Sequence, residues 1–238
     1  ITERTRAITV VHAWGHPCDM DRIREIARKH NLWVIEDCSH AFGTEYKNRK
    51  VGSIGDVACF SMQKNKPLSC GEGGILTTRH RSVYERAIFL GHPGRLEETQ
   101  YHNYGSGLGF KYRPHPLVVS LAATQLRKFD RVTAYKNKNP DYLTRKLREI
   151  PLIKGMDSAP YCTARSYYSY RLQNRTDNID TKTLLRELKE QGVPVKADPY
   201  IPLHQQALFQ GDRCRCHCLP TTEKLHAQTL ELKLPVKP

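Results

Sequence analysis

Short apolar runs alternate with amphipathic stretches through the first half of the chain, which predicts a sheet whose strands are joined by helices. Four apolar runs predict strands, at residues 7–13, 32–35, 57–62 and 74–78. Apolar residues at helical spacing predict helices over about 20–30, 80–90, 116–129 and 133–149. The first of these helices follows Asp19, a residue type that caps helix N-termini. This order of elements predicts an α/β fold with a mainly parallel sheet covered by helices.

The pattern changes from about Pro151, where the elements become shorter and more mixed. The remaining elements are predicted as a Tyr-rich strand at 167–172, a helix over 180–191, a short strand at 193–195 and a helix over 221–231. We therefore predict a large domain over 1–132 and a small α+β domain over 133–238 that includes the connecting helix.

The composition is that of a folded protein, since 238 residues with 39% hydrophobic content can bury a core without disulfides. Ile1 opens directly onto an apolar strand pattern, so we expect the sequence to start within a domain. Neither a secretory leader nor an apolar stretch of the roughly 18 residues that span a bilayer can be recognised. We expect no membrane association and a cytoplasmic location.

A strong positive charge is the most unusual feature of the composition. The formal net charge is +14, from 38 basic and 24 acidic residues, and such a field attracts anionic partners. The basic residues are spread over predicted helix faces such as 22–30 and 143–149, where acids interrupt them. We therefore expect a solvated basic surface and, because no known nucleic-acid-binding module is recognisable, no nucleic-acid partner.

Eight cysteines are scattered along the chain, and Cys38 and Cys59 lie within or beside apolar strand runs. This pattern predicts reduced, buried thiols rather than a disulfide framework. Cys214, Cys216 and Cys218 could ligate a soft metal or could lie in a surface loop. Because no second Cys/His pair stands nearby at the spacing of zinc sites, we expect no metal.

Three predicted strands end on residues that carry chemistry. The first ends near His12, the second is followed by Asp37, and His40 comes one turn later. The third ends around Ser61, and Lys66 follows in a short loop before a glycine-rich segment. Because functional groups gather beyond the carboxyl ends of strands in open α/β sheets, these side chains mark a candidate site.

An amine, a carboxylate and a hydroxyl are the groups that pyridoxal 5′-phosphate (PLP) requires. The amine forms an imine, the carboxylate keeps the pyridine nitrogen protonated, and hydroxyls and N–H groups hold the phosphate. Lys66, Asp37 and Ser61 supply one group of each kind. Each has an ordinary alternative, because an aspartate at a strand end often caps a turn and a lysine beside glycines is usually solvated. These residues alone predict a ligand-binding α/β domain, with PLP as one option among several.

Longer segments resemble the DegT/StrS family, whose members are fold-type I PLP enzymes that aminate keto sugars and keto cyclitols. The three most specific segments are VIEDCSHAFG (34–43), VGSIGDVACFSMQKNKPLSCGEGG (51–74) and GFKYRPHPLVVSLAATQLRKFD (109–130). The start, VVHAWGHPCDMDRIREIARKHNL, and the C-terminal YYSYRLQ and GVPVKADPYIPLH extend the resemblance over nearly the whole chain. It implies part of the fold-type I large domain followed by the small domain. The family's N-terminal segment, with a Gly/Thr phosphate loop and a ring-stacking aromatic, has no counterpart here.

The resemblance implies a role for each matching residue. Asp37 would pair with the pyridine nitrogen, and His40 would lie against the cofactor ring. Ser61 would bind the phosphate, and Lys66 would carry PLP as an imine. Relatives that dehydrate sugars have a histidine in place of this lysine, so Lys66 favours amino transfer.

Lys111 stands where family members commonly have an asparagine that reaches the cofactor phosphate of a neighbouring subunit. The resemblance therefore implies a homodimer with shared active sites, in which Lys111 binds phosphate. The alternative is a solvated lysine at the start of a helix.

The family implies an aminotransferase that moves an amino group from glutamate or glutamine to a keto sugar, often nucleotide-linked, or to a keto cyclitol such as scyllo-inosose. Lys66 would act as the general base and acid that moves the proton. The rival hypothesis is an inactive, truncated homologue that acts as a binding or regulatory protein. The missing N-terminal segment favours this rival, and the presence of Asp37, Ser61 and Lys66 opposes it.

Overall fold

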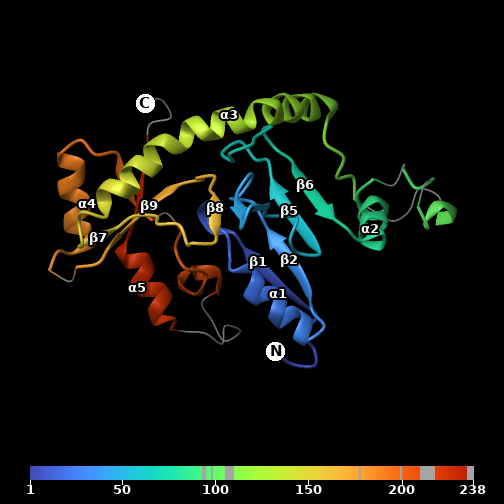
Figure 1. Ribbon diagram of the computed structural model, residues 1–238, viewed down its shortest axis with the longest axis horizontal. Coiled ribbons are helices and arrows are strands. Elements are labelled where there is room, and N and C mark those ends of the chain that lie inside the picture. Colours follow the sequence, from blue (N-terminus) through green and yellow to red (C-terminus); the bar gives the residue numbers. More distant parts are fainter. Residues whose placement is uncertain are drawn as a thin grey trace. The chain divides into compact units, whose positions relative to one another are not determined.

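The computed structural model describes residues 1–92, 95–97, 99–104, 110–176, 178–198, 200–209 and 218–234 (Figure 1). The chain forms two compact units, one of Ile1–Tyr135 with Ser158–Tyr168 and one of Lys136–Asp157 with Ser169–Pro238. The segment Ser158–Tyr168 groups with the first unit, although it follows the predicted domain boundary.

A four-stranded sheet forms the centre of the first unit. Its strands, in spatial order, are β1 (Ala7–Val11), β2 (Trp33–Asp37), β5 (Val57–Ser61) and β6 (Gly74–Thr78). The first three are parallel, and β6 runs antiparallel to β5. All four predicted strands are confirmed. The last one runs antiparallel, and the link from β5 to β6, all of which the structure describes, contains no helix of the kind that usually forms a parallel crossover.

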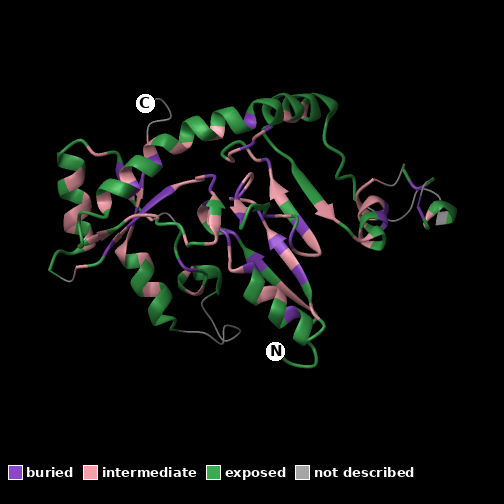
Figure 2. Cartoon of the chain, in the orientation of Figure 1, coloured by how far each residue is buried: buried purple, intermediate pink, exposed green. Residues whose placement is uncertain are grey.

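The helix α1 (Met20–Lys29) connects β1 to β2 and covers one face of this sheet. Asp19 caps it as predicted, since the Asp19 side chain accepts a hydrogen bond from the backbone N–H of Arg22. Its buried residues, Met20 and Ala27, belong to a core that also contains Val10, Val34, Ile54 and Ala58. Figure 2 shows this burial concentrated on the central strands.

Shorter elements complete the first unit. They are the 3-10 turn η1 (Ala13–Gly15), β3 (Glu45–Tyr46), β4 (Arg49–Lys50), α2 (Arg81–Gly91), the 3-10 turn η2 (His102–Tyr104) and β8 (Cys162–Ala164). The strands form a second sheet in the order β4-β3-β8. Because β8 pairs with β3, this sheet ties the segment after the predicted boundary to the first unit.

A single long helix, α3 (Pro116–Leu147), replaces the two helices predicted over 116–129 and 133–149. The intervening residues contain neither glycine nor proline, so nothing in them interrupts the backbone hydrogen bonds. Pro140 lies inside the helix, and the Thr144 hydroxyl donates a hydrogen bond to its carbonyl oxygen over 2.7 Å. Among the described residues, no helix is long and apolar enough to cross a membrane.

The described part of the second unit contains an antiparallel sheet, two helices and the C-terminal part of α3. The strands, in spatial order, are β10 (Val195–Ala197), β11 (Thr229–Leu232), β9 (Tyr170–Asn174) and β7 (Ile153–Lys154). The helices are α4 (Thr181–Glu190) and α5 (Pro220–Gln228), and two 3-10 turns, η3 (Leu203–Gln205) and η4 (Ala207–Phe209), precede α5. The helix predicted over 221–231 therefore ends early. Residues 229–232 become a strand because they pair with β9 on one side and β10 on the other.

The burial of the cysteines agrees only in part with the prediction of buried thiols. Cys38 is buried as expected, but Cys59 is exposed, because alternation along β5 turns Ala58 to the core and Cys59 to the other face. Cys218 is an exposed free cysteine, whereas Cys214 and Cys216 lie outside the described residues.

Candidate active site

The carboxyl ends of the three parallel strands meet at one edge of the first sheet. Along this edge Val11 of β1 is level with Asp37 of β2, which is level with Cys59 of β5. The backbone N–H of His12 donates to the carbonyl oxygen of Asp37 over 3.0 Å. Ser61 ends β5. Asp37 and Ser61 therefore lie at the edge where open α/β sheets collect functional groups.

A fully buried carboxylate, Glu36, fixes the backbone next to Asp37. One Glu36 oxygen lies 3.0 Å from Nε2 of His12. The two carboxylate oxygens also accept hydrogen bonds from the backbone N–H groups of Gly52, Ile54 and Gly55. Burial opposes ionisation, but these hydrogen bonds outweigh it and hold the pKa of Glu36 below its ordinary value. This clamp holds the end of β2 and with it the position of Asp37.

The same region brings together three groups of a kind that could bind a metal. The ligand atoms of His12, Glu36 and Cys38 lie within 4.8 Å of one another. However, Nδ1 of His12 accepts a hydrogen bond from the backbone N–H of Cys18, and Nε2 bonds to Glu36. Because burial raises the pKa of the Cys38 thiol, that sulfur is protonated at neutral pH. We interpret the group as a structural hydrogen-bond centre.

Lys66 lies on the loop between β5 and β6. Its backbone N–H donates to the carbonyl oxygen of Gln63 over 2.9 Å, and Gln63 forms a bridge with Gly71 farther along the loop. Lys66 is half-buried, whereas Lys64 in the same loop is exposed. Burial lowers the pKa of the Lys66 amine, and the negative charge of Asp37 partly opposes this shift. Lys66 therefore has one feature expected of a reactive amine, a pKa that burial has lowered.

His40 lies in an aromatic group with two residues that the sequence had not marked as functional. Its ring stacks on Tyr168, with centroids 4.1 Å apart and planes 9° apart, and on Trp14 at 4.8 Å and 25°. The Lys66 ammonium nitrogen lies 4.6 Å from the centre of the Tyr168 ring. This contact links the aromatic group to the candidate reactive lysine. Trp14 could have been noticed from the sequence, since it follows the first strand, whereas nothing local distinguishes Tyr168 from its tyrosine neighbours.

A tight backbone contact holds Trp14 and Tyr168 in place. Trp14 and Gly15 both have positive φ, 55° and 79°. A Cβ atom on Gly15 would lie 1.9 Å from the carbonyl oxygen of Ser166, so only glycine fits there. The Thr44 hydroxyl bridges the two segments, donating to the Gly15 carbonyl over 3.0 Å and accepting from the Ser166 backbone N–H over 3.2 Å.

Lys111 differs from the other predicted site residues in its surroundings. It is exposed, in the extended segment before α3, where the backbone N–H of Tyr112 donates to the carbonyl oxygen of Gly91 at the end of α2. In the described part of the chain, Lys111 forms no hydrogen bond or ion pair with Asp37, His40, Ser61 or Lys66. Within the first unit, the charge of Asp37 therefore acts on Lys66, and Tyr168 contacts both Lys66 and His40. Lys111 does not take part in these interactions.

This set of groups fits a PLP cofactor in its chemistry. A lowered pKa increases the fraction of unprotonated Lys66 amine, the form that reacts with an aldehyde. One Asp37 oxygen is held by the backbone N–H of Ser39 over 2.9 Å, which orients the carboxylate. His40 offers a flat ring, and Ser61 a hydroxyl at the neighbouring strand end. The lysine, carboxylate and hydroxyl predicted from the sequence are therefore positioned on one sheet edge and its adjoining loop.

Comparison with known proteins places this geometry in context. The sequence profile described as the DegT/DnrJ/EryC1/StrS aminotransferase family matches residues 1–238. L-glutamine:scyllo-inosose aminotransferase of Streptomyces griseus is 39% identical over 178 residues, 71% of this chain and 42% of that protein. A putative L-glutamine:3-amino-2,3-dideoxy-scyllo-inosose aminotransferase of Micromonospora echinospora is 34% identical over 213 residues, 88% of this chain and 51% of that protein. The chain spans about half the length of the curated relatives it matches.

Solved structures share the fold. The aminotransferase from Psychrobacter cryohalolentis has a TM-score of 0.85 and 25% identity, over 98% of this chain and 64% of that chain. DesV from S. venezuelae has a TM-score of 0.81 and 27% identity, over 98% of this chain and 60% of that chain.

Proposed function

Because the chain belongs to the DegT/DnrJ/EryC1/StrS aminotransferase family, we propose that it forms the catalytic part of a PLP-dependent aminotransferase. The observation that carries this proposal is the position of Lys66, which is half-buried in the loop after β5 with its amine 4.6 Å from the centre of the Tyr168 ring that stacks on His40. A lysine that served only solubility would be solvated, as Lys64 is in the same loop.

The family resemblance suggests a role for each residue, and the positions of the residues are compatible with these roles. PLP, when bound, supplies a pyridine ring that draws negative charge away from the reacting carbon. The Lys66 amine holds the cofactor covalently between turnovers, and when free it moves a proton to and from the α-carbon of the amino donor. The Asp37 carboxylate accepts a hydrogen bond from the ring nitrogen and keeps it protonated. His40 packs against the ring, and the Ser61 hydroxyl donates to the phosphate.

We further propose that the amino donor is glutamine or glutamate and that the acceptor is the ketone of a cyclitol or sugar. Support comes from relatives whose names state an L-glutamine donor and a scyllo-inosose acceptor. A third relative is GDP-perosamine synthase of Escherichia coli O157:H7, 36% identical over 150 residues, 63% of this chain and 41% of that protein. Lys66 supports transfer of an amino group rather than dehydration, because relatives that dehydrate sugars have a histidine at this position.

The protein is proposed to act as a homodimer in which Lys111 reaches the phosphate in the neighbouring subunit's site. Lys111 lies in a segment whose apolar side chains are unusually exposed: Phe110 is 64% exposed, Tyr112 71% and Leu117 74%. Large apolar side chains grouped on a surface are typical of interfaces. A buried phosphate dianion needs more than one hydroxyl and backbone donors for compensation, and a lysine from the partner would provide it.

The proposal is tested by supplying the protein with PLP, glutamine or glutamate, and a panel of keto sugars and scyllo-inosose. Aminotransfer predicts loss of the amino donor that depends on the acceptor and appearance of an aminated acceptor by mass spectrometry. The Lys66→Ala variant serves as the matched control. PLP retention without acceptor-dependent donor loss for any ketone in the panel would instead support the binding or regulatory alternative.

A further inference from the structure

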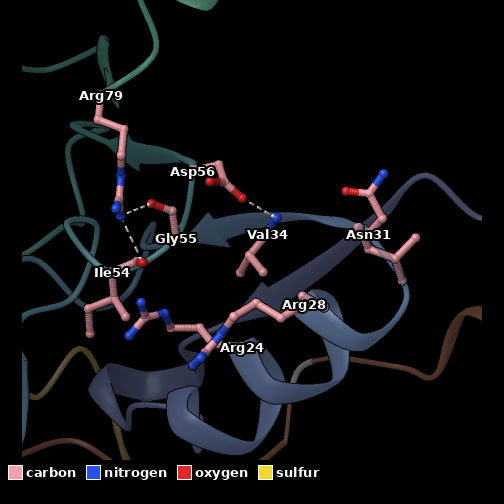
Figure 3. Close-up of a pocket in the computed structure, with 10 residues that line it drawn as sticks. Arg24, Arg28, Asn31, Val34, Ile54, Gly55, Asp56 and Arg79 are labelled. Atoms are coloured by element: carbon pink, nitrogen blue, oxygen red, sulfur yellow. Dashed lines mark hydrogen bonds between the residues drawn. The ribbon is translucent and has the colours of Figure 1, made fainter.

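A polar cavity of about 270 Å³ lies at the end of the sheet opposite to Asp37 and Ser61 (Figure 3). It is lined near the beginning of β2 by Val34 and just before β5 by Ile54 and Gly55. The last turns of α1 form another wall. None of the residues assigned above to catalysis or cofactor binding lines this cavity.

Three arginines line the cavity. Arg24 and Arg28 extend side by side from α1 toward Ile54, and Arg79 approaches the same turn from the opposite side (Figure 3). Nη2 of Arg79 donates to the carbonyl oxygens of Ile54 and Gly55, over 3.0 and 2.7 Å. These two bonds fix the Arg79 guanidinium at the wall and leave its other N–H groups available.

Arg24 and Arg28 are one helical turn apart, and like charges at this spacing destabilise a helix. Neither forms an ion pair within 4.0 Å in the described part of the chain. Asp21 lies within electrostatic reach of Arg24, but its carboxylate is bonded to Lys47 over 2.6 Å. Arg28, in the last turn of α1, also suits the negative end of the helix dipole. Together with the half-buried Arg24, it nevertheless places two guanidinium groups without an ion-pair partner among the described residues at the cavity wall.

Asp56 is the one carboxylate among the residues that line the cavity, and its oxygens are already engaged. One accepts from the backbone N–H of Val34 over 2.8 Å, and the other lies 3.0 Å from Nε2 of His80. Three guanidinium groups therefore line the cavity together with one carboxylate, whose two oxygens already have other partners. The cavity carries an excess of positive charge and of unused hydrogen-bond donors.

We propose that this cavity is a binding site for a small phosphate-bearing solute, such as inorganic phosphate, pyrophosphate or a phosphate ester. Guanidinium groups match phosphate oxygens in both charge and bidentate geometry. The volume lies just below the range of about 300–1,000 Å³ typical of small-molecule sites, which suits a compact anion better than a large ligand. The site is separate from the one that holds the cofactor phosphate.

Isothermal titration calorimetry with sodium pyrophosphate at constant ionic strength tests the proposal. The protein is loaded with PLP and unbound PLP is removed by gel filtration beforehand, so that the cofactor's own phosphate position is filled while the cavity stays free. We expect saturable binding to the wild type and a dissociation constant raised about tenfold or more in Arg24→Gln/Arg28→Gln, since each lost charged hydrogen bond is worth about that factor. The matched control is Arg22→Gln/Lys29→Gln, which removes the same charge from exposed positions of α1 that do not line the cavity.

Equal weakening in both double variants would overturn the proposal, because binding would then follow the general charge of the helix. Absence of binding to the wild type would overturn it as well, and so would unchanged binding in Arg24→Gln/Arg28→Gln. Chemical protection gives the location directly: pyrophosphate should slow phenylglyoxal modification of Arg24 and Arg28 but not of Arg22, as read by peptide mass spectrometry. Neither readout requires aminotransferase activity, so failure here leaves the proposed function untouched.

Discussion

The ammonium group of Lys66 lies over the ring of Tyr168, 4.6 Å from its centre, although more than a third of the chain separates the two residues. Tyr168 in turn stacks on His40, the residue expected to lie against the cofactor. A segment that follows α3 therefore returns to complete the surroundings of the loop lysine.

Lys66 and Lys64 differ in burial within one loop, which gives a direct test of the reactive lysine. Lys66→Ala should abolish covalent retention of PLP after borohydride reduction, because the amine that reacts with the aldehyde is gone. Lys64→Ala is the matched control and should retain it. Peptide mass spectrometry locates the reduced cofactor, and finding it on Lys64 would refute the assignment.

Asp37 raises the pKa of Lys66 while burial lowers it, so loss of the Asp37 charge should lower that pKa further. Competitive acetylation of PLP-free protein at a series of pH values should show the Lys66 midpoint at lower pH in Asp37→Asn. Turnover should also fall about 100-fold or more, because the charge that holds the ring nitrogen protonated is lost. Asp21→Asn, which removes an exposed carboxylate paired with Lys47, should change neither quantity. A Lys66 midpoint that stays constant or rises in Asp37→Asn would contradict the electrostatic effect of Asp37 on Lys66.

Shared active sites predict complementation between two inactive variants. Lys66→Ala and Lys111→Glu proteins, each inactive alone, should regain part of the activity when mixed under conditions of subunit exchange. A hybrid dimer would then place both lesions in one site and leave the other intact. No recovery despite demonstrated exchange would indicate that Lys111 serves its own chain or is only a solvated residue.

Gly15 and Gly71 both have positive φ, 79° and 93°, but only Gly15 lies against backbone. Gly71→Ala should cost about 1–2 kcal/mol, the strain of a left-handed alanine. Gly15→Ala adds a clash with Ser166 and should cost more than about 3 kcal/mol. Urea unfolding followed by tryptophan fluorescence measures both, since Trp14 and Trp33 lie in the first unit. Equal losses in the two variants would argue against the close contact.

Glu36→Gln should destabilise the first unit by about 2–4 kcal/mol, because an amide cannot accept all the hydrogen bonds that the carboxylate accepts. The pKa of Glu36 is lowered on folding, so its ionised form stabilises the protein above the unfolded value of about 4.3. This contribution is lost as the pH falls through the folded pKa. Urea unfolding at several acidic pH values should therefore show a weaker pH dependence in Glu36→Gln than in the exposed control Glu25→Gln. Identical pH profiles would show that Glu36 is not the group responsible.

The sequence by itself determined the local elements and the chemical residues at strand ends. Alternating apolar and turn residues located β1, β2, β5, β6 and α1 closely, because these elements depend on nearby side chains and on capping. Asp37 and Ser61 could be predicted to share an edge, since the carboxyl ends of parallel strands converge. Their roles, and those of His40, Lys66 and Lys111, rest on the family resemblance and remain predictions.

Only the tertiary structure decided which distant segments meet. The stacking of Trp14, His40 and Tyr168, the approach of Gly15 to Ser166 and the cavity beside Arg24 depend on contacts between residues far apart in sequence. The strand at 229–232 was predicted as helix for the same reason: its pattern is compatible with both, and pairing with β9 and β10 selects the strand. The preference of a residue for helix or strand amounts to tenths of a kcal/mol. Packing and strand pairing therefore decide such segments, and their partners lie far away in the sequence.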